Sequence, residues 1–141
     1  MRADERWRSI PGLANWAAEE FGETEAVVDG PVRLSFRELG RQAQRAARGF
    51  AALGVEPGDR VAIWAPNLWE WVVALLGLQA AGAVLVPLNT RFKGEEAAYV
   101  LEKSRARALV VVEGFLGNDY VDLLRGARGG EGEGRPVAGL P

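Results

Sequence analysis

Residues 60–89 read RVAIWAPNLWEWVVALLGLQAAGAVLVPLN, and this stretch decides the fold. It opens with a short apolar run, Arg60 to Trp64, which is typical of a buried β-strand. It closes with a second apolar run, Val84 to Val86, and Pro87 is expected to end that strand because proline has no N–H to donate. The segment between the two runs is long enough to form a helix, so the stretch predicts a strand, a helix and a second strand.

The predicted helix runs from about Leu68 to Ala81. Asn67 is its expected N-cap, Glu70 lies in its first turn, and Gly82 fits the position just past its end. Its apolar positions continue nearly all round the helix, through Trp71, Val72, Leu75 and Leu76. The isolated chain is therefore expected to expose apolar surface that another part of a longer protein covers.

Further along the chain, the same alternation continues. Glu95 to Ser104 predicts another helix, with two glutamates favouring its first turn, and Ala108 to Val112 predicts a third buried strand. Three apolar strands alternating with two helices form the βαβαβ pattern, for which a parallel sheet is the expected packing. The fold class is α/β. A last helix is expected from about Asn118 to Arg125.

The N-terminal part predicts a helix and a small hairpin. Apolar residues recur at helical spacing from Pro11 to Phe21, and Gly22 is expected to stop this helix. Ala26 to Asp29 and Val32 to Phe36 then read as two short strands around a Gly-Pro turn. This hairpin lies outside the βαβαβ pattern.

Ser35 is expected to open the next helix, because Ser35 and Glu38 have the spacing of a capping box. The predicted apolar face of this helix is formed by Phe36, Leu39, Ala43, Ala47, Phe50 and Leu53. Gly54 fits the left-handed position after its end. We interpret Ser35 and Glu38 as structural residues and not as site residues, since the cap accounts for both.

Composition excludes several classes of function. Hydrophobic residues make up 48% and charged residues 26% of the 141 residues, which is the balance of a globular protein. The net charge is −2 and no basic face is implied, so no nucleic-acid partner is expected. The sequence has no cysteine and no histidine, which excludes thiolate metal sites and Ser-His catalysis within these residues.

The two ends of the chain carry little patterned apolar sequence. The N-terminus, MRADERWRSIPG, lacks the apolar region of a secretory signal, and no stretch predicts a membrane span, so the expected location is cytoplasmic. We expect residues 1–125 to form one N-terminal domain part. Residues 126–141 are rich in glycine and are interpreted as a loop or linker at which a longer chain is truncated.

Three stretches resemble core motifs of the adenylate-forming superfamily, which includes acyl-CoA synthetases, peptide-synthetase adenylation domains and luciferases. Leu34 to Leu39, LSFREL, resembles the first core motif, with phenylalanine where tyrosine is usual. Gly54 to Ile63 resembles the strand region that follows. Leu78 to Asn89 resembles the second core motif, and its Pro-Leu-Asn ending, followed by Arg91, is similar to acyl-CoA ligases.

This resemblance implies the partial N-terminal subdomain of an AMP-forming acyl-CoA ligase. Such an enzyme joins a carboxylic acid to CoA through an acyl-adenylate, using ATP, Mg²⁺ and CoA. The resemblance implies that the phosphate-binding loop and the catalytic lysine lie beyond residue 141, and that the partner of this chain is the remainder of the ligase. We therefore assign no catalytic, cofactor-binding or metal-binding residue within the chain, and expect the chain alone to be inactive.

Five side chains have a possible ligand role beside a structural one. Trp64, Trp69 and Trp71 could stack on an adenine or line an acyl pocket, although core packing explains them more simply. Asn89 and Arg91 follow the end of a strand, where ligands gather in open α/β sheets, although they also suit a turn.

Other functions remain open at this point. The main alternative is a non-catalytic interaction module that keeps the ligase fold and pairs with a separate polypeptide; an unrelated small nucleotide-binding protein is a third. The acid could be fatty, aryl or steroid-derived. Phe115 to Tyr120 resembles actinobacterial ligases that act on steroid-degradation acids.

Overall fold

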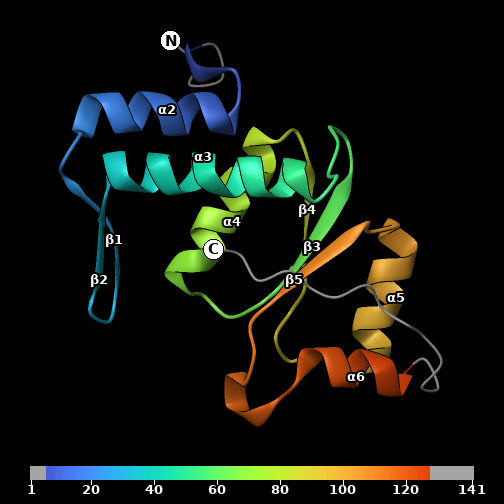
Figure 1. Cartoon of the computed structure of the whole chain (residues 1–141). Helices are drawn as coiled ribbons and strands as arrows, with labels where there is room; N and C mark the ends of the chain where they lie inside the picture. Colours follow the sequence, from blue (N-terminus) through green and yellow to red (C-terminus); the bar gives the residue numbers. More distant parts are fainter. Residues whose placement is uncertain (1–5, 128–141) are drawn as a thin grey trace.

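The computed structural model describes residues 6–127, which form three layers (Figure 1). A parallel sheet lies in the middle, and one group of helices packs on each of its two faces. One group contains α2 (Ile10–Phe21), α3 (Phe36–Ala52) and α4 (Trp69–Ala80), and the other contains α5 (Gly94–Ser104) and α6 (Tyr120–Ala127). The predicted α/β class is confirmed.

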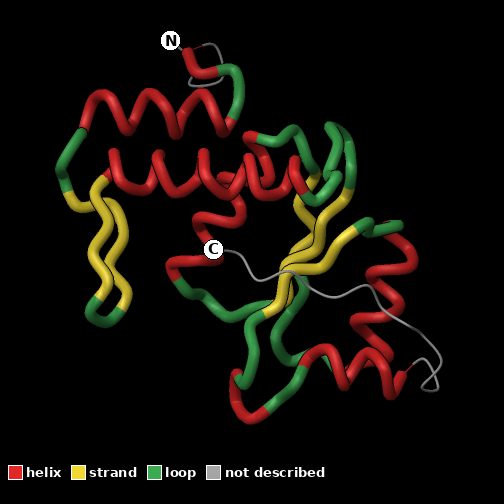
Figure 2. The backbone as a smooth tube through the Cα atoms, in the orientation of Figure 1, coloured by secondary structure: helices red, strands yellow, loops and turns green. Residues whose placement is uncertain are grey.

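The parallel sheet has the strand order β4-β3-β5 (Figure 2). The central strand β3 (Arg60–Trp64) pairs in parallel with β4 (Val84–Pro87) on one edge and with β5 (Ala108–Val111) on the other. This arrangement confirms the βαβαβ prediction, with β5 ending one residue earlier than expected. The edge partner of Ile63 in β4 is Pro87, which is the last residue of that strand.

Strand β3 divides the core into two apolar clusters. Val61 and Ile63 pack with side chains of α3 and α4, whereas Ala62 and Trp64 pack with side chains of α5 and α6. All four side chains are at most 1% exposed. A parallel strand covered by helices on both faces reads as a continuous apolar run and not as an alternating one, which is why residues 61–64 are apolar throughout.

The hairpin forms a second, separate sheet. Strands β1 (Glu25–Asp29) and β2 (Val32–Ser35) pair antiparallel, and Figures 1 and 2 show them standing apart from the parallel strands. Gly30 has a φ of +53° in the tight connection, a conformation that glycine adopts without strain. The predicted hairpin is confirmed.

Helix α3 begins as predicted at Ser35, but only half of the capping box forms. The Ser35 hydroxyl accepts a hydrogen bond from the Glu38 N–H at 3.1 Å. The Glu38 carboxylate turns along the helix instead and accepts hydrogen bonds from Arg41 and Gln42. The helix is thus capped by Ser35 alone. Leu53, expected on the apolar face, is the C-cap residue and is 58% exposed.

The last helix is shifted relative to the prediction. It spans Tyr120–Ala127, because the Asp119 carboxylate caps it by accepting hydrogen bonds from the N–H groups of Val121 and Asp122 at 2.9 and 3.0 Å. The predicted linker therefore begins inside this helix at residues 126–127, and the rest of it lies outside the described residues. No helix within residues 6–127 is long and apolar enough to cross a membrane.

The Tyr120 hydroxyl has no hydrogen-bond partner among residues 6–127. Its ring stacks on Trp64 with a centroid distance of 4.3 Å, and the residue is 1% exposed. Burial raises the pKa of Tyr120 above its ordinary value of 10.0, because the charged phenolate is disfavoured away from water. The hydroxyl therefore opposes folding, and does so more strongly at alkaline pH.

Replacing Tyr120 by phenylalanine is expected to raise the free energy of unfolding by about 1 kcal/mol. Since Tyr120 ionises first in the unfolded chain as pH rises, its contribution to stability should be constant below about pH 10 and fall above it. Tyr120→Phe should remove this part of the fall. Urea denaturation between pH 7 and 11 measures both effects. The control Tyr99→Phe changes an exposed side chain and should shift stability by less than about 0.5 kcal/mol. A loss of stability in Tyr120→Phe would show that the hydroxyl has a favourable partner.

Candidate functional site

Asn89 and Arg91 form a turn at the carboxyl end of β4. The Asn89 side-chain oxygen accepts a hydrogen bond from the Arg91 N–H at 2.9 Å, and its main-chain oxygen accepts one from the Trp64 indole N–H at 3.0 Å. Both residues are exposed. Asn89 therefore has the structural role of a turn residue, and its side-chain oxygen is engaged within the turn.

The three tryptophans with a candidate ligand role fall into two groups. Trp64 is fully buried and stacks on Tyr120, so it belongs to the core. Trp69 and Trp71 are half-buried and line an open cavity of about 370 Å³. This volume lies within the range of small-molecule pockets, which makes the cavity the candidate site in the described part of the chain.

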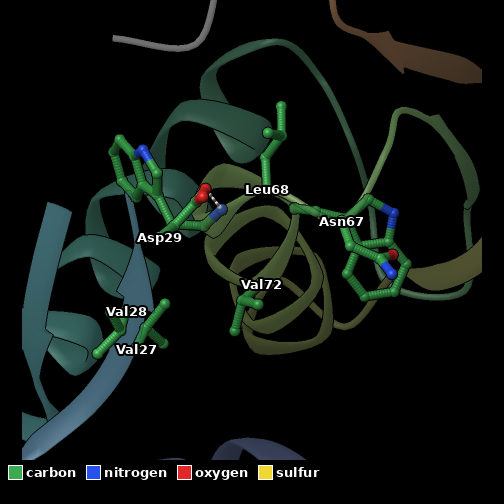
Figure 3. A pocket seen from close by; sticks show the side chains of 8 residues that line it. Val27, Val28, Asp29, Asn67, Leu68 and Val72 are labelled. Atoms are coloured by element: carbon green, nitrogen blue, oxygen red, sulfur yellow. Dashed lines mark hydrogen bonds between the residues drawn. The ribbon is translucent and has the colours of Figure 1, made fainter. Parts of the chain in front are cut away.

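The cavity lies between the hairpin and the start of α4 (Figure 3). Figure 3 shows Val27 and Val28 on strand β1 and Val72 on the helix, at opposite sides of the opening. Its lining consists of Val27, Val28, Asp29, Asn67, Leu68, Trp69, Trp71 and Val72. Most of these side chains are apolar, so the cavity suits an apolar group and not a phosphate.

Asp29 connects the two walls of the cavity. Its carboxylate accepts a hydrogen bond from the Trp69 N–H at 3.0 Å, which Figure 3 shows as a dashed line. Trp69 is the first residue of α4, so the negative charge also lies at the positive end of the helix dipole. Asp29 thus caps α4 from 40 residues upstream in the sequence.

The sequence-based prediction that Asn67 caps α4 is wrong. The N-cap residue is Leu68, and no side chain in the preceding loop makes a capping hydrogen bond. Asn67 is exposed at the rim of the cavity. Local spacing suggested Asn67, whereas the hairpin brings Asp29 to the helix through tertiary structure that spacing alone does not reveal.

Replacing Asp29 by alanine is expected to lower the free energy of unfolding by about 1.5 kcal/mol, as for other helix caps. Asp29→Asn keeps an acceptor but loses the charge, so about half of the loss is expected. Asn67→Ala is the matched control and should change stability by less than about 0.5 kcal/mol. Urea denaturation of the three variants decides between the two caps: a larger loss in Asn67→Ala would contradict the structural assignment.

The site offers binding surface more than chemistry. Within residues 6–127, no three His, Cys, Asp or Glu side chains are grouped so that they could hold a metal ion. The carboxylate of the cavity, Asp29, is engaged with the backbone of α4. The arrangement therefore positions apolar side chains and a helix terminus. Neither Asn89 nor Trp64 is among the residues that line the cavity.

Comparison with known proteins identifies the family. The family profile described as AMP-binding enzyme matches residues 14–135. A ligase of Rhodococcus jostii, named 3-[(3aS,4S,7aS)-7a-methyl-1,5-dioxo-octahydro-1H-inden-4-yl]propanoyl:CoA ligase, is 47% identical over 117 residues, covering 83% of this chain and 23% of the relative. The ligase of the same name from Mycobacterium tuberculosis is 41% identical over 112 residues, covering 79% and 22%.

Solved structures agree in fold. The N-terminal domain of FACL13 from Mycobacterium tuberculosis matches with a TM-score of 0.71 and 30% identity, over 73% of this chain and 27% of that one. The chain spans about a quarter of the length of the curated relatives named above. The resemblance read from the three motifs is confirmed, and the chain belongs to the AMP-binding enzyme family of acyl-CoA ligases and related proteins.

Proposed function

We propose that the chain is the N-terminal part of an AMP-forming acyl-CoA ligase, which converts a carboxylic acid, ATP and CoA to acyl-CoA, AMP and pyrophosphate. The observation that carries this proposal is the family match over residues 14–135, together with 47% identity to a relative named as a CoA ligase. The fold also supports the proposal, because the structure of this chain matches part of the N-terminal domain of FACL13.

The acid is proposed to be a fused-ring propanoic acid. The two relatives at 47% and 41% identity carry the name of one ligase, whose acyl group is a propanoyl chain on a methylated bicyclic indene-type ring. The Bacillus subtilis protein YngI shares 32% identity with the chain, and the mouse medium-chain acyl-CoA ligase ACSF2 shares 34%. The higher identity to the first two favours a compact ring acid over an unbranched fatty acid.

In this proposal the chain supplies scaffold to the enzyme, and the residues that bind Mg²⁺-ATP and CoA belong to another part of the ligase. Three of the carboxylates are already engaged in holding structural elements. Asp29 caps α4, Asp59 contacts Arg107 and the Glu56 N–H, and Asp119 caps α6. The chain alone is accordingly expected not to form acyl-adenylate.

A chimera tests the proposal. The chain replaces the matching N-terminal region of the Rhodococcus jostii ligase, and AMP release is measured with the bicyclic propanoic acid, ATP and CoA. The chimera should be active, whereas the 141-residue chain alone and the relative without its N-terminal region should not be. Pyrophosphate exchange by the isolated chain, or a folded but inactive chimera, would contradict the proposal.

A further inference from the structure

Helix α4 has one face buried and one face partly open. Side chains on the buried face, Val73, Ala74 and Leu78, are at most 9% exposed and pack into the cluster formed with α3 and β3. The opposite side of the helix, which we call the free face, consists of Trp71, Val72, Leu75 and Leu76, all half-exposed. A helix that is apolar all round belongs to a protein interior, so the free face is incomplete as it stands.

Two apolar cavities border the free face. Trp71 and Val72 line the cavity beside the hairpin described above. Leu76 lines a second cavity of about 180 Å³, whose other walls are side chains of α2 and α3, including Ile10, Leu13 and Leu39. Ile10 and Leu13 are 47% and 38% exposed. The open apolar surface therefore continues from β1 across α4 to α2.

Charge separates this surface from the outer side of α3. The second cavity is lined by apolar residues and glycine, and the first contains Asp29 and Asn67 as its polar residues. Asp29 is directed to the α4 backbone by its hydrogen bond to Trp69. In contrast, Arg41 and Arg45 on α3 are well exposed and contact Glu38 on their own helix. The apolar surface around α4 therefore suits contact with an apolar segment of polypeptide, whereas the charged outer side of α3 suits contact with water.

We propose that the free face of α4 and its two bordering cavities form the docking surface for the rest of the AMP-binding domain. This inference rests on the proposed function. The N-terminal domain of FACL13 shares this fold, and the chain corresponds to 27% of its length. A domain of that size holds further chain that must pack somewhere on the same scaffold, and burying apolar side chains is the main favourable term in such packing. Within residues 6–127, the free face and its two cavities form a continuous open apolar surface that a docking segment would cover.

Cysteine labelling tests the docking surface directly, because the chain has no cysteine of its own. Leu75→Cys reports on the free face, Ala74→Cys on the buried face of the same helix, and Arg48→Cys on the exposed side of α3. Each is placed in the isolated chain and in the chimera with the Rhodococcus jostii ligase. Labelling by a maleimide is followed peptide by peptide with mass spectrometry, so that cysteines of the graft do not interfere.

Leu75→Cys is expected to react at least about tenfold more slowly in the chimera than in the isolated chain, whereas Arg48→Cys reacts equally in both. Ala74→Cys should be protected in both, which shows that the helix is packed. If Ala74→Cys is not protected in the isolated chain, the helix is not packed there, and the labelling rates within the chimera test the proposal instead. In the chimera, Leu75→Cys must then react at least about tenfold more slowly than Arg48→Cys. Equal rates at these two positions in the chimera would overturn the proposal.

Two further readings separate the alternatives. If Leu75→Cys is already protected in an isolated chain that light scattering shows to be a dimer, a second copy covers the free face and the proposal fails. AMP release by the same chimera without the cysteine tests the proposed function separately. An active chimera with a fully reactive Leu75→Cys refutes the docking surface and leaves the ligase assignment intact.

Discussion

Gly77→Ala is expected to lower the free energy of unfolding by about 2 kcal/mol, because α3 and α4 cross too closely to admit a methyl group. A Cβ at residue 77 would lie 2.6 Å from the Cβ of Ala46, and 3.1 Å from both the Ala43 oxygen and the Ala47 nitrogen. Two of these three atoms belong to the α3 backbone, so no side-chain rotation relieves the contact. The two helices would have to move apart over Ala74 and Leu78, which are almost completely buried.

The matched control is Gly49→Ala on α3. A Cβ at residue 49 meets nothing within 4 Å, so only the helix preference of alanine acts, and stability should rise by about 1 kcal/mol. The same substitution in two touching helices is thus expected to give opposite signs. Urea denaturation monitored by tryptophan fluorescence measures both variants. If both substitutions change the free energy of unfolding in the same direction, the close crossing of α3 and α4 is refuted.

Much of the fold follows from local sequence signals. The run from Arg60 to Trp64 is apolar at four successive positions because helices cover both of its faces, and this made the central strand readable. Gly54 and Gly82 adopt φ values of +84° and +79° after α3 and α4, as expected for residues just past a helix end. Periodicity and end signals of this kind act within a few residues, so they need no knowledge of the tertiary structure.

The contacts between helices and strands could not be predicted from such local signals. Nothing near Gly77 in the sequence shows that α3 lies against it, and the cap of α4 comes from Asp29 and not from the neighbouring Asn67. The candidate cavity is likewise formed by segments that are about 40 residues apart. Sequence reasoning did anticipate that Trp71 and its neighbours leave α4 with an open apolar side, because that depends on composition around a single helix.

Arg60 is another long-range contact that local patterns did not indicate. Its guanidinium group donates hydrogen bonds of 3.0 Å to the main-chain oxygens of Ser104 and Arg105, where α5 ends. A third bond of 3.0 Å goes to the Gly58 oxygen. The last carbonyls of a helix have no partner within the helix and carry partial negative charge. Arg60 therefore holds the end of α5 to the start of β3.

Arg60→Ala is expected to lower the free energy of unfolding by about 2 kcal/mol, since it removes three charge-assisted hydrogen bonds in a partly exposed setting. Arg60→Lys should lose about 1 kcal/mol, because an ammonium group cannot reproduce the planar fork that reaches three carbonyls. Arg48→Ala, on the exposed side of α3, serves as the control for removal of a positive charge.

Hydrogen exchange distinguishes this role from a general loss of stability. The Arg105 and Ala106 amides donate to the Glu102 and Leu101 oxygens in the last turn of α5. In Arg60→Ala these two amides should exchange faster by a larger factor than the amides of α3, because the end of α5 loses its anchor while the α3–α4 crossing is untouched. A uniform change across both helices would mean that Arg60 contributes only to global stability, and the assignment of Arg60 as the anchor of α5 would then be wrong.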